Sequence, residues 1–161
     1  MLLVADQVLS PITPHISPQA LHPHNGIERY LAGLARLRVL KGIEHVLPAH
    51  YDPIGDLGTR IDGIARHHAD RSQEVLGLCA SPRSVKEVAK ALYGEQAGYN
   101  VLLALQEAGA HVEYLHQVGG LAIANLEELE VDPAAAVHYR AVTTSGVAPT
   151  VQLSAEGPPA A

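Results

Sequence analysis

The sequence predicts an α/β fold, because two short apolar segments with strand character flank a segment with helical periodicity. Residues 2–5 form the first apolar run, which ends at Asp6, and residues 43–49 form the second, which ends at His50. Between the two runs, apolar side chains recur every three or four residues, as on one face of a helix. In open α/β layers, ligands and catalytic groups collect just past the carboxyl ends of strands, which makes Asp6 and His50 the first candidates for a functional site.

The length and composition of the chain restrict its class. A length of 161 residues suits one domain, or part of a domain followed by a small one. Aromatic residues make up only 4% of the chain, with no Trp or Phe, so the core must be built from Leu, Ile, Val and Ala. A formal net charge of -6 argues against a protein whose main partner is a nucleic-acid backbone, because that binding needs clustered Lys and Arg. The single cysteine, Cys79, excludes an internal disulfide and fits a reducing compartment.

The amino terminus lacks the features of a secretory signal, since Met1 leads directly into apolar residues with no basic segment and no cleavage site. No apolar run approaches the length of a membrane span. We therefore expect a soluble, cytoplasmic protein that does not associate with membranes. A central strand is an unusual start for a protein, because it leaves unpaired backbone groups and an exposed apolar edge. A truncated gene, a misplaced start codon and a genuine fragment would each account for it.

The first unit continues as a loop, a helix, a strand and a second helix. Four prolines and a closing Asn-Gly pair predict an irregular loop over residues 10–26, and a loop of this length is usually functional. We predict helices over residues 27–41 and about 56–80, with a strand at residues 43–47 between them. One apolar stripe of the second helix, with a gap around Ser72, consists of Leu57, Ile61, Ile64, His68, Val75 and Cys79.

Residues 82–142 have the pattern of a second, smaller unit. A capping box at residues 84–87 opens a short helix, and residues 99–117 form a longer one. The expected inward positions of the longer helix are Leu102, Leu105, Val112 and Leu115. Two short strands, about 121–126 and 136–142, can pair with each other. The order helix, turn, helix, hairpin is the outline of a winged helix.

The segments around the two polar residues at the strand ends resemble those of a known family. Leu-Val-Ala-Asp-Gln-Val-Leu at residues 3–9 and Ile-Thr-Pro-His-Ile-Ser at residues 12–17 are similar to the S-G-D-x-(V/L)-L … I-T-P-x-I-S segment of metallo-β-lactamase-fold hydrolases. Val-Leu-Pro-Ala-His at residues 46–50 is similar to their V-L-P-(G/A)-H segment. One departure is Ala5, where the family usually has Gly. It adds a methyl group at the strand end but removes no ligand.

By this resemblance, Asp6 would bridge two metal ions and His50 would ligate the second, with zinc as the metal. The family's other ligands come from an H-x-H-x-D-H motif and a later His, all before the Asp, so we expect this chain to lack them. The resemblance implies the C-terminal part of a metallo-β-lactamase αββα sandwich at residues 1–81. A winged-helix-like α+β domain, which one subgroup of the family carries, would follow at residues 82–142. Residues 143–161 are small and polar, and we predict a disordered tail there.

The remaining histidines have simpler interpretations. His15, His22 and His24 on the proline-rich loop could hold a stray metal or face a substrate, but solvated loop histidines are the favoured interpretation. The H-x-H spacing of His22 and His24 is not followed by the Asp-His of the family motif. His67 and His68 point about 100° apart on their helix, so both cannot easily bind one ion. His68 falls on the apolar stripe and is expected in the core or at an interface, and neither residue is given a catalytic role.

The resemblance implies a hydrolase that uses zinc-bound hydroxide to cleave an ester, thioester or amide-like bond of a small-molecule substrate. A catalytic zinc site needs three protein ligands, so we expect this chain alone to be inactive or nearly so. The alternative is a non-catalytic interaction fragment. Such a fragment would pair with a complementing chain or form a homo-oligomer through its open sheet edge.

A winged-helix regulator that binds DNA is the least favoured function. Residues 99–118, where the recognition helix would lie, contain no Lys or Arg and include Glu107 and Glu113. Phosphate groups would repel such a helix. We expect instead that this unit packs on the hydrolase half and shapes its substrate entrance.

Overall fold

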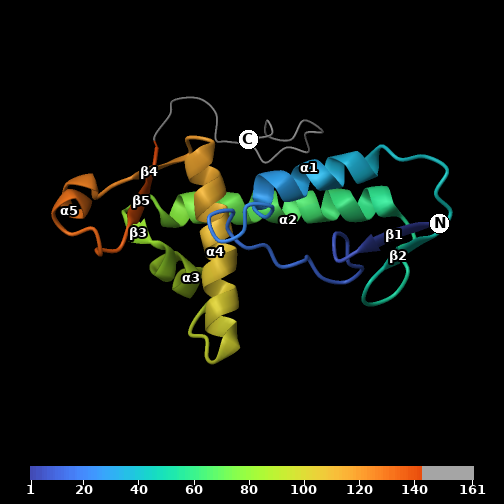
Figure 1. Ribbon diagram of the computed structural model, residues 1–161, viewed down its shortest axis with the longest axis horizontal. Helices are drawn as coiled ribbons and strands as arrows, with labels where there is room; N and C mark the ends of the chain where they lie inside the picture. Colours follow the sequence, from blue (N-terminus) through green and yellow to red (C-terminus); the bar gives the residue numbers. More distant parts are fainter. Residues whose placement is uncertain (143–161) are drawn as a thin grey trace.

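The computed structural model describes residues 1–142, and the predicted disordered tail at residues 143–161 lies outside the described residues. The described part is elongated, with a small sheet toward each end and helices between them (Figure 1). The predicted α/β class is confirmed. In chain order the elements are β1 (Leu2–Ala5), α1 (Ile27–Arg38), β2 (Val46–Pro48), α2 (Leu57–Leu78), β3 (Arg83–Ser84), α3 (Val85–Tyr93), α4 (Tyr99–Gln117), β4 (Leu121–Ile123), α5 (Leu126–Val131) and β5 (His138–Ala141). Each helix in this range is too short or too polar to cross a lipid bilayer.

The first sheet consists of β1 and β2, which pair in parallel. Leu3 lies opposite Leu47, and Ala5 lies opposite Pro48. Parallel strands need a crossover connection, and α1 provides it here. Because the strands are parallel, their carboxyl ends lie at the same edge of the sheet, which is the edge that carries the predicted site.

The helices of the first half of the chain are α1 and α2. Each presents one apolar face to the core, and the two lie side by side (Figure 1). The buried side chains of α1 include Ile27, Leu31 and Leu34. α2 begins where the Asp56 carboxylate accepts a hydrogen bond from the backbone N–H of Thr59 at 3.0 Å, which caps the helix. α1 ends at Arg38, before the predicted end at residue 41. The next residues, Val39 and Leu40, are exposed, so a further helical turn would bury nothing.

The second half contains α3, α4 and a three-stranded antiparallel sheet with the strand order β3-β5-β4. The predicted capping box is present, since Ser84 Oγ accepts from the Glu87 N–H at 3.3 Å and Glu87 Oε2 accepts from the Ser84 N–H at 2.8 Å. The predicted strand pair is also present, with Leu121 opposite Ala141. β3 and α5 were not predicted, because β3 has only two residues and α5 buries none of its side chains.

One hydrophobic core runs through both halves, because α4 contacts α1, α2 and α3. Its largest fully buried apolar side chains include Leu34, Ile61, Ile64, Val88, Leu115 and Leu121. On α4, the predicted inward residues Val112 and Leu115 are buried, whereas Leu102 is 45% exposed. The prediction for Leu102 is wrong because the amino-terminal end of α4 projects past α2 (Figure 1).

Candidate functional site

Asp6 and His50 meet at the edge where β1 and β2 end. The His50 Nε2 atom lies 3.7 Å from the Asp6 Oδ1 atom. The Asp6 and His50 side chains are 65% and 68% exposed, so packing leaves both available to an external group. An oxygen and a nitrogen that share a tetrahedral zinc ion lie about 3.3–3.5 Å apart, given metal–ligand distances of about 2.0–2.2 Å. The observed separation of 3.7 Å is slightly wider than this range, and two exposed side chains can close that gap around one ion.

The backbone beside both residues is strained. Within residues 1–142, the non-glycine residues with positive φ are Ala5, at 46°, and Tyr51, at 69°, and they adjoin Asp6 and His50 in the sequence. A left-handed conformation costs a non-glycine residue about 1–2 kcal/mol, and such strain gathers at functional sites. The positive φ of Ala5 also accounts for the Gly that the metallo-β-lactamase family usually has there, since Gly adopts this conformation without that cost.

A cavity of about 520 Å³ opens beside the two residues. Among the side chains that line it are those of Asp6, His15, His24, Arg29, Tyr30 and His50. Two of the three candidate loop histidines, His15 and His24, thus belong to the cavity wall. His22 is exposed to solvent and does not line the cavity.

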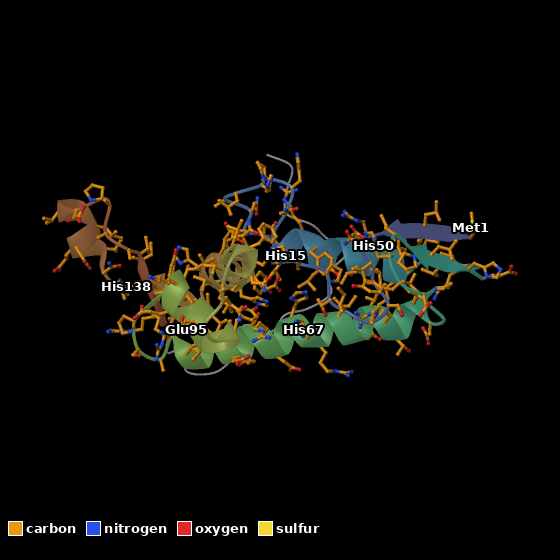
Figure 2. The ribbon with its side chains drawn as sticks, turned by 90° about the horizontal axis from the view of Figure 1, so that it is seen from below. Met1, His15, His50, His67, Glu95 and His138 are labelled. Carbon is orange, nitrogen blue, oxygen red and sulfur yellow. The ribbon has the colours of Figure 1, made fainter. Side chains whose placement is uncertain are left out.

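His15 is held in place by α4. Its Nδ1 atom lies 3.1 Å from Glu107 Oε2, and its Nε2 atom lies 3.1 Å from Gln106 Oε1. Figure 2 shows His15 near the middle of the molecule, with His50 toward the end that carries Met1 and His138 toward the other end. The second half of the chain therefore fixes a residue in the cavity wall of the first half.

Two carboxylates of α4 also hold the backbone of the proline-rich loop. Glu107 Oε2 accepts from the Ile16 N–H at 3.2 Å. Glu113 accepts from the Gln19 N–H at 2.6 Å and from the Ala20 N–H at 2.9 Å. Burial raises the pKa of Glu107, while the Ile16 N–H and His15 favour its charged form. These are the acidic residues that argue against phosphate binding by α4, and in the structure they bind the loop.

The first half anchors the start of the loop independently. Arg60 of α2 donates from Nε to the Leu9 carbonyl oxygen and from Nη2 to the Ile12 carbonyl oxygen, both at 2.6 Å. The Tyr30 hydroxyl donates to the Gln7 carbonyl oxygen at 2.9 Å, and burial raises the pKa of Tyr30, which keeps it a donor. Helices from both halves thus fix the loop that forms much of the cavity wall.

A second group of metal-ligand side chains lies between α2 and α4. His68 and His111 are fully buried, and His68 Nδ1 is 3.4 Å from His111 Nε2. Ser72 Oγ lies 3.2 Å from His111 Nδ1. One ligand atom from each of His68, His111 and Glu107 lies within 4.8 Å of the other two. Burial lowers the pKa of His68 to about 3 and also lowers the pKa of His111, so both rings are neutral near pH 7.

The sequence carries only a weak signal for this cluster. His68 was expected in the core or at an interface, and the structure places it in the core. His68 and Ser72 are four residues apart, as are Glu107 and His111, so each pair lies on one face of its helix. Which two faces meet depends on how α2 and α4 cross, and helical periodicity does not determine that. The sequence prediction therefore missed the cluster as a unit.

Comparison with known proteins identifies the fold. No protein-family model and no curated protein matches this chain. Among solved structures, a β-lactamase domain protein from Burkholderia ambifaria is similar, with a TM-score of 0.73 and 27% identity over 86% of this chain and 40% of that chain. A metallo-β-lactamase family protein from Thermus thermophilus is also similar, with a TM-score of 0.68 and 23% identity over 87% of this chain and 41% of that chain.

The chain therefore has the metallo-β-lactamase fold over the part it spans, as its sequence resemblance implies. At 86% coverage or more, the structural match extends across both halves of the chain. The chain spans about two fifths of the length of these solved structures.

Proposed function

We propose that this chain is part of a metal-dependent hydrolase in which Asp6 and His50 hold zinc beside the cavity formed by the proline-rich loop. The observation that carries the proposal is the 3.7 Å approach of a carboxylate oxygen and an imidazole nitrogen at the edge of a parallel sheet. The fold supports it, because ligands of open α/β layers collect at the carboxyl ends of the strands.

The donor chemistry of this edge suits zinc, which binds carboxylate oxygen and imidazole nitrogen. Two donors hold an ion weakly, because a catalytic zinc site has three protein ligands. A complete site with one or two zinc ions would need ligands beyond Asp6 and His50. We therefore expect the chain by itself to bind zinc weakly at this edge and to hydrolyse esters no faster than a buffer control.

Zinc, when bound, lowers the pKa of a water molecule and makes hydroxide available near neutral pH. The residues of this chain would position the ion and the substrate around it. Both ring nitrogens of His15 are engaged by α4, so His15 would shape the cavity and not transfer protons. Arg29 adds a positive charge to the wall, which favours the carbonyl oxygen of an ester, thioester or amide-like substrate.

We further propose that residues 82–142 form a winged-helix-like unit that acts on the substrate cavity and not on nucleic acid. The support comes from α4, whose side chains Gln106, Glu107 and Glu113 all contact the loop. Helix α4 contains no Lys or Arg, so it offers phosphate groups no attraction.

Site-resolved zinc binding tests the proposal. Zn²⁺ is titrated into the isotope-labelled chain while the backbone amide signals of Gln7 and Tyr51, which adjoin the two ligands, are followed by NMR. We expect these signals to shift, and Asp6→Ala and His50→Ala each to weaken the response about 10-fold or more. Asp52→Ala removes an exposed carboxylate two residues past His50 and is the matched control. Equal responses from the Asp6→Ala and Asp52→Ala proteins would show that zinc does not use this edge.

An activity assay tests the expectation that the chain is inactive alone. The chain is incubated with p-nitrophenyl acetate, with and without Zn²⁺. We expect no zinc-dependent release of nitrophenolate, because two protein ligands do not make a catalytic zinc site. Zinc-dependent hydrolysis that Asp6→Ala abolishes would contradict this expectation and would still support zinc at the edge.

A further inference from the structure

We propose that the cluster of His68, Glu107 and His111 is a second metal site, suited to Zn²⁺ or a similar divalent transition-metal ion. The three side chains come from α2 and α4, and one ligand atom of each lies within 4.8 Å of the other two. Asp6 and His50 take no part in it, because they lie at the edge where β1 and β2 end. The second site therefore shares no ligand with the strand-edge site, although Glu107 also holds His15 and Ile16 beside the cavity.

The spacing of the two imidazoles fits a shared ion better than a hydrogen bond between them. His68 Nδ1 and His111 Nε2 are 3.4 Å apart, longer than the usual range of about 2.7–3.2 Å for hydrogen bonds from N–H donors. Two nitrogens bound at about 2.0–2.1 Å to one tetrahedral zinc ion lie about 3.3–3.4 Å apart. The pair is therefore already at the separation of two ligands.

Both rings are in the state that binds a metal. Burial lowers the pKa of each histidine, so each offers a neutral imidazole. His111 would bind through Nε2 while its Nδ1–H donates to Ser72 Oγ, 3.2 Å away, and such an outer partner commonly orients a ligating histidine. His68 Nε2 is buried and has no hydrogen-bond partner within residues 1–142. The ion would be bound through His68 Nδ1, which faces His111, and it would leave Nε2 without a partner.

Glu107 supplies the negative charge that a divalent ion needs. Its contacts with His15 and Ile16 both use Oε2, which leaves Oε1 for an ion. The competing positive charge is Arg71. Its guanidinium pairs with Glu74 Oε2 at 3.0 Å and lies 5.1 Å from the centre of the Tyr93 ring, so part of its charge is neutralised outside the cluster.

A second cavity adjoins the cluster at Glu107. This cavity has a volume of about 540 Å³, and its wall includes Glu107, His67, Arg71 and Tyr93. Glu107 thus lies both in the wall of this cavity and in the cluster, so an ion in the cavity meets one of the three ligands.

The test uses the full chain with Asp6→Ala and His50→Ala combined, which removes the donors of the strand edge. The chelator-stripped protein is titrated with Zn²⁺ against a competing metal indicator, and with Co²⁺ while its visible absorption is recorded. We expect one equivalent of Zn²⁺ to bind and Co²⁺ to give the strong visible bands of a tetrahedral site. Failure of this double variant to take up Zn²⁺ would overturn the second site and leave the strand-edge proposal untouched.

Substitutions in the same background locate the ion. Glu107→Gln keeps the size of the side chain and both histidines, and we expect it to weaken Zn²⁺ binding about 10-fold or more. Ser72→Ala removes only the partner that orients His111, and we expect a loss of about 10–100-fold. His22→Ala with His24→Ala removes two exposed loop histidines and is the matched control, with no expected loss.

The outcomes separate a built site from ordinary surface binding. If Glu107→Gln and Ser72→Ala bind Zn²⁺ as tightly as their background, the ion is not in the cluster. If the loop control abolishes uptake, the ion is held by the surface histidines. Either result would overturn the proposal. Circular dichroism of each variant confirms that a loss of binding is not a loss of fold.

Discussion

The two groups of metal-type ligands in this chain are built in opposite ways. Asp6 and His50 lie at a strand edge, are about two-thirds exposed, and adjoin residues with left-handed backbone conformations. His68 and His111 lie between two long regular helices and are fully buried. The edge keeps its ligands accessible at the cost of local strain, whereas the cluster depends on packing. Substitutions at the edge should therefore change binding with little change in stability, and substitutions in the cluster should change both.

The largest expected effect is a loss of stability in acid that arises from the cluster. The unfolded histidines titrate near pH 6.5, whereas burial lowers the folded-state pKa of His68 to about 3 and also lowers that of His111. Below pH 6.5 the unfolded chain binds protons that the folded chain excludes. The free energy of unfolding should then fall by about 1.4 kcal/mol per pH unit for His68, with its contribution complete near pH 3, and His111 should act in the same direction. Above pH 7 both states are neutral and the effect vanishes.

Urea unfolding between pH 7.5 and pH 5, with a chelator present, measures this loss. At pH 5 the His68 contribution should amount to about 2 kcal/mol, and the His111 contribution should add to the loss. His22→Ala with His24→Ala, which changes only exposed loop histidines, should give the same pH profile as the unaltered chain. A stability that is flat from pH 7 to pH 5 would show that the cluster is not buried in neutral form.

Truncation of a buried ligand should cost far more stability than truncation of an edge ligand. His111→Ala leaves a cavity in the core and removes the partner of Ser72, so we expect a loss of about 2–4 kcal/mol in the free energy of unfolding. His50→Ala removes an exposed side chain and should stay within about 0.5 kcal/mol of the unaltered chain. Urea unfolding at pH 7.5 without metal compares them. Similar losses of unfolding free energy in the two variants would contradict the view that the cluster depends on packing and the edge does not.

The contacts between the halves should make a smaller contribution. Glu113→Ala removes the acceptor for the backbone N–H groups of Gln19 and Ala20, so we expect a loss of about 1–2 kcal/mol. Amide hydrogen exchange at these two residues should become faster. Glu130→Ala, at an exposed position of α5, is the control and should change neither the stability nor the amide exchange of Gln19 and Ala20. Unaltered exchange in the Glu113→Ala protein would mean that α4 does not hold the loop.

The smallest expected effect is a gain in the free energy of unfolding when the strain at the edge is relieved. Ala5→Gly relieves the left-handed conformation of Ala5 but adds freedom to the unfolded chain, so the net gain should be about 0.5–1 kcal/mol. Ala122→Gly, at an exposed strand position with no positive φ, should lose stability instead. Thermal unfolding of both variants tests the strain, and a loss at both positions would argue that the edge is relaxed.

The sequence predicted the parts of the fold that depend on local pattern. The helix over residues 99–117 was predicted with its observed ends. The strand predicted at residues 43–47 is instead Val46–Pro48, and α1 is shorter than predicted. The error at the end of α1 comes from the apolar residues Val39 and Leu40, which pattern alone assigns to the helix although they are exposed. Periodicity reports which residues are apolar and not which are buried.

The functional residues also divide into those that local sequence pattern indicates and those that depend on how the helices pack. The approach of Asp6 and His50 follows from two strand ends and could be expected from the sequence, although zinc binding by them stays a prediction. The roles of Glu107 and Glu113 could not be read in the same way, because their negative charge only indicated repulsion of phosphate. Their contacts with the loop, and the approach of His68 to His111, depend on how α4 crosses the first half of the chain.

The central claim, that Asp6 and His50 share a metal ion at the strand edge, is tested most directly by crystallography. Crystals of the chain grown with Zn²⁺ are measured at wavelengths on both sides of the zinc absorption edge. We predict an anomalous peak between Asp6 Oδ1 and His50 Nε2, about 2.0–2.2 Å from each atom. Well-ordered side chains at this edge without an anomalous peak between them, at saturating Zn²⁺, would contradict the claim.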